Sequence, residues 1–211
     1  MSNHGVSDTD DLLRRSANGS ASAVERLFGR YRDQLRRMVI ARLDGRFLRR
    51  VDPSDVIQET LAEAHRRLPD YLRDRPIAFY PWLRQLAARR LTAVHRHHLA
   101  ASKRSIVRED TPVPPISEDS LPDLATRVVG SLAEPADQVA HRETLRAVAA
   151  GLMELADDDR ELLILRHVEQ LSVADTAAVL RVAEGTVKSR HYRALNRLRS
   201  ILKKAGIDGD A

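Results

Sequence analysis

The sequence has no cysteine, few aromatic residues and no long apolar run, and each of these absences excludes a class of protein. A chain of 211 residues without cysteine can form neither disulfides nor thiolate metal sites. No run of about eighteen apolar residues is available to cross a membrane, and the N-terminus lacks the basic-then-apolar pattern of a signal peptide. Strands are not expected, because β-branched residues hardly alternate with polar ones. The sequence therefore predicts an all-α protein of the cytoplasm.

The charge of the chain points to a binding partner and not to catalysis. The formal net charge is +5 at pH 7 and the pI is about 9.9, which favours a polyanionic partner. The chain has no glycine-rich phosphate loop and no His-Glu-x-x-His motif. His95, His97 and His98 do not share one helix face, and Asp55 and Glu59 lack a third metal ligand. We therefore expect no enzyme activity, no cofactor and no bound metal.

Residues 160–199 carry the pattern of a helix-turn-helix. Ser172 and Asp175 have the spacing of a weak capping box at the start of a short helix, and residues 181–184 form a tight connection to a second helix. One stripe of the second helix is mainly apolar and consists of Val187, His191, Ala194 and Leu198. Another stripe, about a quarter turn away, is polar and basic and consists of Thr186, Arg190, Arg193 and Arg197.

The charge of this C-terminal segment favours DNA as its partner. Residues 181–204 contain eight lysines or arginines and one acid, Glu184, whereas a solvated helix face normally mixes both signs. We therefore expect the second helix to enter the major groove of duplex DNA. The alternative is an amphipathic helical hairpin with a merely solvated charged face.

A helix is expected over residues 51–68, with Asp52 as N-cap, Pro53 at its first position and Asp55 in its first turn. The side opposite its apolar stripe is polar and partly acidic and consists of Asp55, Gln58, Glu59, Ala62 and Arg66. An acidic patch repels DNA, so this face suits a basic protein surface better. An ordinary solvated face is the alternative.

The next segment combines aromatic and basic residues. Residues 69–82 are rich in turn formers and hold four of the eight aromatic residues, and residues 82–108 contain seven lysines or arginines and no acid. Such interleaving is typical of proteins that bind single-stranded nucleic acid, because rings stack on unpaired bases and cations follow phosphates. Trp82 fits a core position at least as well, since it shares helical spacing with Leu83 and Leu86.

The centre of the chain has the composition of a linker. Residues 109–138 hold five of the nine prolines and seven acids against one base, Arg127. This composition predicts a flexible, acidic, proline-rich connection. We expect a helical domain over residues 10–104, a linker over 105–138 and a second helical domain, with the helix-turn-helix, over 139–204.

Three stretches in this order resemble the extracytoplasmic-function (ECF) sigma factors of bacterial RNA polymerase. They are DPSDVIQETLAEAHRRL, FYPWLRQLAARRL and EGTVKSRHYRALNRLR, at residues 52–68, 79–91 and 184–199. The resemblance implies that the face beginning at Asp55 docks on the clamp helices of the polymerase largest subunit. It also implies that the aromatic and basic segment captures the melted −10 element, and that the helix-turn-helix reads the −35 element as duplex.

The resemblance also assigns roles to individual residues. The polymerase-binding candidates are Asp55, Gln58, Glu59, Ala62 and Arg66. The −10 and melting candidates are Tyr80, Trp82, Arg89, Arg90, Arg96, Lys103 and Arg104, with flipped bases near Tyr80. The −35 candidates are Glu184, Thr186, Lys188, Ser189, Arg190, Arg193 and Arg197, with Arg199 as a further phosphate contact. Core polymerase and promoter DNA are the implied partners; on an anti-sigma factor, a further candidate partner, the sequence is silent.

The chain departs from the family pattern at four positions. Arg181 stands where the family usually turns on glycine, and Ala183 stands where a serine usually caps the recognition helix. Arg89 and Ala93 replace the usual asparagine and aspartate of the melting segment. The remaining alternative is a stand-alone DNA-binding repressor or activator that shares only the helix-turn-helix, which leaves the acidic face unexplained.

Overall fold

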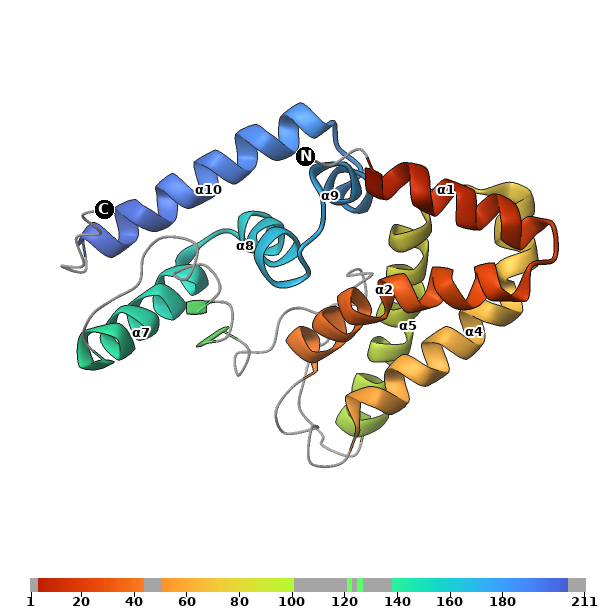
Figure 1. Ribbon diagram of the computed structural model, residues 1–211. Coiled ribbons are helices and arrows are strands. Elements are labelled where there is room, and N and C mark those ends of the chain that lie inside the picture. Colours follow the sequence, from red (N-terminus) through yellow and green to blue (C-terminus); the bar gives the residue numbers. More distant parts are fainter. Residues whose placement is uncertain (1–3, 44–50, 101–120, 123–124, 127–137, 205–211) are drawn as a thin grey trace. The chain divides into compact units, whose positions relative to one another are not determined.

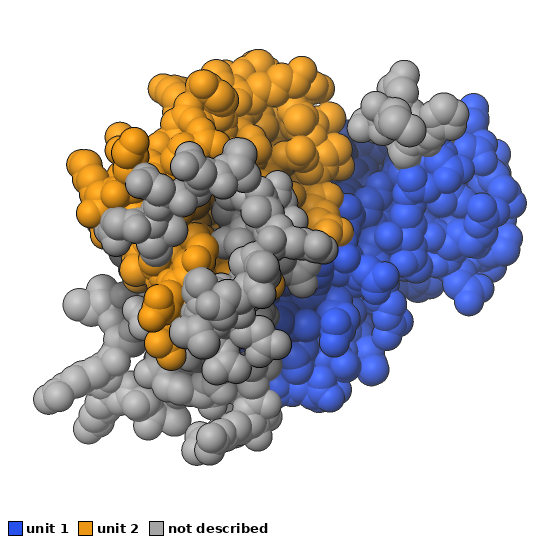
Figure 2. Space-filling model, turned by 60° about the vertical axis from the view of Figure 1, so that its left-hand side comes forward, with its two compact units in different colours: residues 1–115 blue, residues 116–211 orange. Residues whose placement is uncertain are grey.

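The computed structural model describes residues 4–43, 51–100, 121–122, 125–126 and 138–204, and these are helical with short connections and no strand (Figure 1). The predicted all-α fold is thereby confirmed. The chain divides into two compact units, residues 1–115 and 116–211 (Figure 2). Most of the segment predicted to be a linker lies outside the described residues, and the predicted domain boundaries stay a prediction.

The first unit contains four described helices. They are α1 (His4–Ala17), α2 (Ala21–Arg42), α4 (Pro53–Asp74) and α5 (Phe79–Ala100). Helix α1 lies against α2, and α2, α4 and α5 pack against one another (Figure 1). Leu27, Leu35 and Met38 of α2 and Leu83 and Leu91 of α5 are fully buried in the shared core. Burial of these apolar stripes is the main stabilisation of the bundle.

The starts of α2 and α4 follow from their capping residues. Ser20 accepts a hydrogen bond from the backbone N–H of Ala23 at 3.4 Å, after the turn in which Gly19 adopts a φ of 82°. Asp52 accepts from the backbone N–H of Ser54 at 2.7 Å, and Pro53 occupies the first turn. The predicted N-cap at Asp52 is confirmed.

Helix α4 does not end at Leu68, where a turn-rich segment was predicted, but continues through Pro69 to Asp74. Proline lacks the amide that would bond to the carbonyl four residues earlier. The helix continues because Tyr71 is buried, with its ring centroid 4.6 Å from that of Trp82 and 5.5 Å from that of Phe79. The helix ends only at Arg75, which adopts the left-handed conformation with a φ of 38°.

The second unit is built around a three-helix core. Its elements are α7 (Gln138–Glu154), α8 (Asp157–Leu163), the π-helical segment η2 (Ile164–Val168), α9 (Val173–Leu180) and α10 (Glu184–Lys204). Helix α10 packs on α7, α8 and α9. Gly151 lets α7 approach α10 closely, because a Cβ at this position would lie 3.0 Å from Cδ1 of Leu198. The guanidinium of Arg160 donates to the carbonyls of Leu152, Met153 and Leu155 and so caps the C-terminus of α7.

Helices α9 and α10 form the predicted helix-turn-helix. The backbone N–H of Asp175 donates to Ser172 Oγ at 2.9 Å, and that hydroxyl donates to the Asp175 carboxylate at 2.7 Å. Arg181 ends α9 in the left-handed conformation with a φ of 56°, where glycine would be unstrained. Helices α8, α9 and α10 meet in a buried apolar contact formed by Leu162, Ala177 and Val187. The π-helical segment η2 was not predicted, since its residues fit an α-helical stripe.

Replacing Ala183 with serine should raise the free energy of unfolding by about 1 kcal/mol. The carbonyl of Ala183 accepts from the backbone N–H groups of Thr186 and Val187, so this residue stands at the N-cap of α10 with no side-chain oxygen. A serine hydroxyl would satisfy one free N–H of the first turn. Urea unfolding measures the effect. The same exchange at the exposed Ala93 inside α5 is the control, and a gain there of equal size would contradict the capping argument.

Candidate nucleic-acid and protein interfaces

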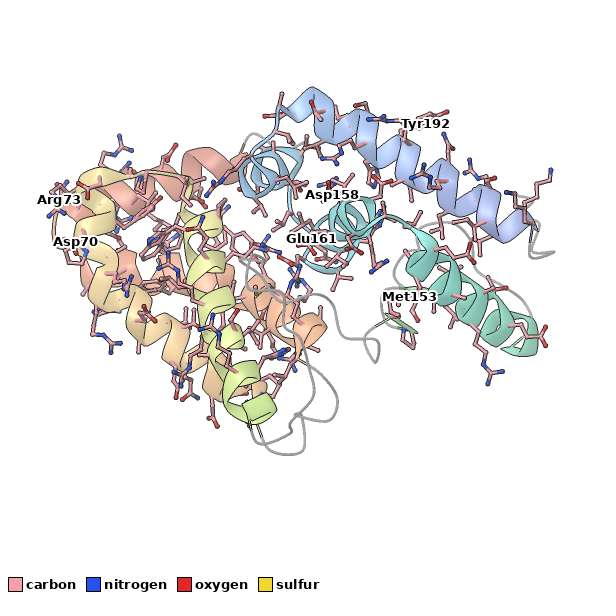
Figure 3. The ribbon with its side chains drawn as sticks, turned by 180° about the vertical axis from the view of Figure 1, so that it is seen from behind. Asp70, Arg73, Met153, Asp158, Glu161 and Tyr192 are labelled. Carbon is pink, nitrogen blue, oxygen red and sulfur yellow. The ribbon has the colours of Figure 1, made fainter. Side chains whose placement is uncertain are left out.

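The free face of α10 is the first candidate interface. Val187, Ala194 and Leu198 point into the domain, as predicted, and Tyr192 on the opposite side is 69% exposed (Figure 3). The residues that share this outward side are exposed; we call them the free face, and they are Lys188, Ser189, Tyr192, Arg193 and Arg199. The sequence pattern identified four of them but not Tyr192. Its position, three residues after Ser189 and opposite the buried stripe, was the available signal.

Two of the predicted DNA-facing arginines lie on the flank of α10 and are paired within the domain. Arg190 Nη2 lies 3.0 Å from Asp158 Oδ2, and Arg197 Nη1 lies 3.3 Å from Asp159 Oδ2. Both acids belong to the first turn of α8, which packs on α10. Thr186, on the same stripe, is half-buried, and Glu184 is exposed at the first residue of the helix. The basic stripe is therefore divided between solvent and an acidic neighbour.

A histidine pair joins η2 to α10. The Nε2 atoms of His167 and His191 lie 3.0 Å apart, and their rings stack at an interplanar angle of 19°. Burial, aided by the charges of His191 and Arg166, lowers the pKa of His167 from 6.5 to about 4. Burial and Arg166 also lower the pKa of His191. Both rings are therefore neutral near pH 7, and one Nε2–H donates to the other Nε2.

The second unit should lose stability as the pH falls below about 6.5. The pKa of His167 is about 4 in the folded state, lower than in the unfolded chain. The stabilisation by the neutral histidine pair is therefore complete when the pH is above the pKa of the unfolded chain. This stabilisation is lost as the pH falls toward the folded value. Urea unfolding followed by amide NMR signals of α10 measures the loss. His167→Gln with His191→Gln should flatten the pH dependence; the exposed His65→Gln is the control, and an unchanged profile in the double variant would refute the assignment.

Helix α5 carries the second group of candidates. Arg89, Arg90 and Arg96 are exposed, whereas Lys103 and Arg104 lie outside the described residues. Tyr80 is 1% exposed and its ring stacks on that of Tyr31, with centroids 5.5 Å apart, while its predicted place beside flipped bases stays a prediction. It therefore offers no ring face to a flipped base in this arrangement.

Trp82, another of the predicted melting residues, packs against the core of the first unit. It is half-buried, with its ring centroid 4.6 Å from that of Tyr71 and 5.6 Å from that of Phe79. The core alternative considered from the sequence describes this position well. The rings of Tyr80 and Trp82 thus pack inward and Arg89, Arg90 and Arg96 face outward, whereas Arg84 of the same segment is buried.

The polar face of α4 is the third candidate interface. All five of its predicted residues, Asp55, Gln58, Glu59, Ala62 and Arg66, are exposed on α4. Glu59 forms an ion pair with Arg90 of α5. The predicted polymerase-binding face and the predicted melting face are therefore in direct contact within the first unit.

Neither a metal centre nor a membrane span is found in the described part of the chain. No group of three or more histidine, cysteine, aspartate or glutamate side chains in that part is placed to hold a metal ion. None of the described helices is both long and apolar enough to span a bilayer.

Known proteins resemble this chain over nearly its whole length. The family "Sigma-70, region 4" matches residues 145–198. The chain is 32% identical over 203 residues to the ECF RNA polymerase sigma factor SigM of Mycobacterium tuberculosis H37Rv, covering 94% of this chain and 86% of that protein. It is 30% identical over 184 residues to the ECF RNA polymerase sigma-E factor of Haemophilus influenzae, covering 87% and 89%.

The fold is also known from a solved structure, that of CnrH in complex with the cytosolic domain of CnrY. The similarity covers 93% of this chain and 98% of CnrH, with 22% identity and a TM-score of 0.52. Because the similarity to SigM extends over both units, the alternative of a regulator that shares only the helix-turn-helix does not hold. The chain belongs to the ECF sigma factors of bacterial RNA polymerase, which are transcription initiation factors and not enzymes.

Proposed function

We propose that this sigma factor binds core RNA polymerase through α4, reads the −35 element with α10 and holds the melted −10 element along α5. The observation that carries the proposal is the separation of charge on the surface. A polar, partly acidic face on α4 and a basic free face on α10 lie in different units of one basic chain. The first suits a basic protein surface and the second suits duplex DNA. The factor acts in the cytoplasm, where polymerase and promoter meet.

The free face of α10 makes the −35 contacts. Ser189 and Arg193, with Thr186 beside them, contact base edges in the major groove, where arginine pairs with guanine and hydroxyls accept or donate. Tyr192 adds apolar contact area at the centre of this face. Lys188 and Arg199 bind phosphates and fix the register of the helix. The carboxylate of Glu184 suits the amino group of a cytosine at the N-terminal end of the helix.

The −10 contacts lie along α5. Arg89 and Arg96 are exposed on this helix and follow the phosphates of the unpaired strand. Lys103 and Arg104 continue the series. Arg90 contributes only when its ion pair with Glu59 opens, since the guanidinium is occupied in the free protein. Trp82, half-buried against the core, supports this helix from within.

Transcription in vitro with mapped start sites tests the proposed function. Purified full-length protein is added to core polymerase on genomic fragments of its source organism. Specific starts that require the protein, and that share sequence at both promoter elements, are expected. If core polymerase neither binds the protein nor changes its start sites, the proposal is wrong.

A further inference from the structure

Three consecutive aspartates, residues 157–159, begin α8, and two of them form ion pairs with arginines of the recognition helix α10. Asp158 holds Arg190 at 3.0 Å and Asp159 holds Arg197 at 3.3 Å, whereas Asp157 lies 3.4 Å from Arg160. Asp158 lies on α8, and Tyr192 projects from α10 on the side away from Asp158 (Figure 3). The side of α10 next to the free face is thus already engaged by anions of the domain itself.

Each of these ion pairs joins one partly shielded side chain to one exposed side chain, since Asp158 is 80% exposed and Arg197 is 60% exposed. The side chain of Arg190 is 27% exposed and that of Asp159 is 19% exposed. Partial removal of water strengthens the attraction between opposite charges. A phosphate that approaches either arginine must displace a carboxylate. DNA of any sequence therefore gains less from these two arginines than from Lys188 or Arg193, for which the structure gives no acidic partner among the described residues.

We propose that Asp158 and Asp159 are specificity-determining residues that withhold Arg190 and Arg197 from the DNA backbone. Phosphate contacts carry no sequence information, so two fewer of them lower binding to all duplexes alike. The affinity that remains depends more on the base contacts of the free face. The inference rests on the proposed reading of duplex DNA by α10. In it, the ion pairs on the flank of α10 reduce binding to DNA of any sequence.

Binding of the full-length protein to two duplexes over a salt series tests the proposal. One duplex is a promoter fragment identified by transcription, and the other is a scrambled duplex of equal length and composition. Asp158→Asn with Asp159→Asn should bind the scrambled duplex on the order of tenfold more tightly at low salt. The slope of log affinity against log salt should steepen by about one for each freed arginine. The ratio of promoter to scrambled affinity should fall.

The control variant removes the same amount of charge without freeing an arginine of α10. Asp157→Asn with Glu154→Gln neutralises two exposed acids of the same unit, and Arg160 keeps its three carbonyl acceptors. This control should change neither the salt slope nor the affinity ratio by a comparable amount. Adding Arg190→Gln and Arg197→Gln to the Asp158→Asn, Asp159→Asn variant should restore the original slope, because the freed guanidinium groups are then gone.

Each other outcome separates the inference from the proposed function. If Asp158→Asn, Asp159→Asn binds both duplexes like the unchanged protein, or more weakly, the inference is wrong, and weaker binding would mean that the acids aim the arginines at DNA. If circular dichroism shows that this variant does not fold, the test is the Arg190→Gln, Arg197→Gln variant of the otherwise unchanged protein. The inference expects this variant to keep the salt slope of the unchanged protein, and a lower slope would contradict it. If the unchanged protein does not distinguish the two duplexes, the proposed reading of duplex DNA by α10 fails instead.

Discussion

Reversing the charge at Asp55 and Glu59 should abolish promoter-specific transcription. Both side chains are exposed on the polar face of α4, so arginines there leave the helix core intact. If a basic polymerase surface docks on this face, each reversal replaces an attraction with a repulsion, and like charges across an interface cost several kcal/mol. We expect core binding to weaken by more than about a hundredfold, since every 1.4 kcal/mol is tenfold. A core-binding titration and runoff transcription measure the two effects.

The matched control for this double reversal lies at the other end of the same helix. Asp70→Arg with Asp74→Arg changes the net charge by the same amount at two exposed positions that pair with Arg73 (Figure 3). Transcription by this variant should remain near the original level. Equal loss in both variants would show that total charge matters and that the face beginning at Asp55 is not the docking surface.

Replacing Arg193 with alanine should cost about 1–3 kcal/mol of promoter binding, which is roughly 5- to 150-fold, and relax the sequence requirement at one −35 position. Arg193 is exposed on the free face and its Nε donates to the carbonyl of Ser189 at 3.4 Å. Among the described residues, the structure gives its guanidinium no acidic partner. Selection from a library of randomised −35 elements measures both effects in one experiment.

Lys188→Ala is the comparison variant on the same face. Removing a phosphate-binding ammonium group there should weaken all promoters alike and lower the salt slope by about one, with no change in the selected sequence. If Arg193→Ala behaves in this way as well, Arg193 binds the backbone. The reading of bases then falls to the other residues of the free face.

The local features of the fold were predictable because they depend on residues close together in the sequence. Spacing within one or two helical turns predicts the N-caps at Asp52 and Ser172. It also predicts the buried stripe of Val187, Ala194 and Leu198. The same holds for the exposure of the polar face of α4, since a single helix has one side against the core. The family assignment used these local patterns in their order along the chain.

The sequence did not show the contacts between residues that are distant along the chain. Arg190 and Asp158 are 32 positions apart, so helical periodicity places the arginine on the surface without showing which acid meets it. Tyr80 is buried because Tyr31 of another helix covers it. Helix α4 passes through Pro69 because Tyr71 finds aromatic partners in α5. In each case tertiary packing overrides the local signal.

The aromatic cluster of the first unit also makes this protein suitable for optical studies of its parts. Trp82 is the only tryptophan of the chain, and it packs beside Tyr71 and Phe79 against the core of the first unit. Tyr192, the one tyrosine of the second unit, is exposed on α10. Tryptophan emission therefore reports the melting of the first unit alone, while circular dichroism at helical wavelengths follows both. Recording the two signals in one thermal scan compares the melting of the first unit with that of all the helices, without a label.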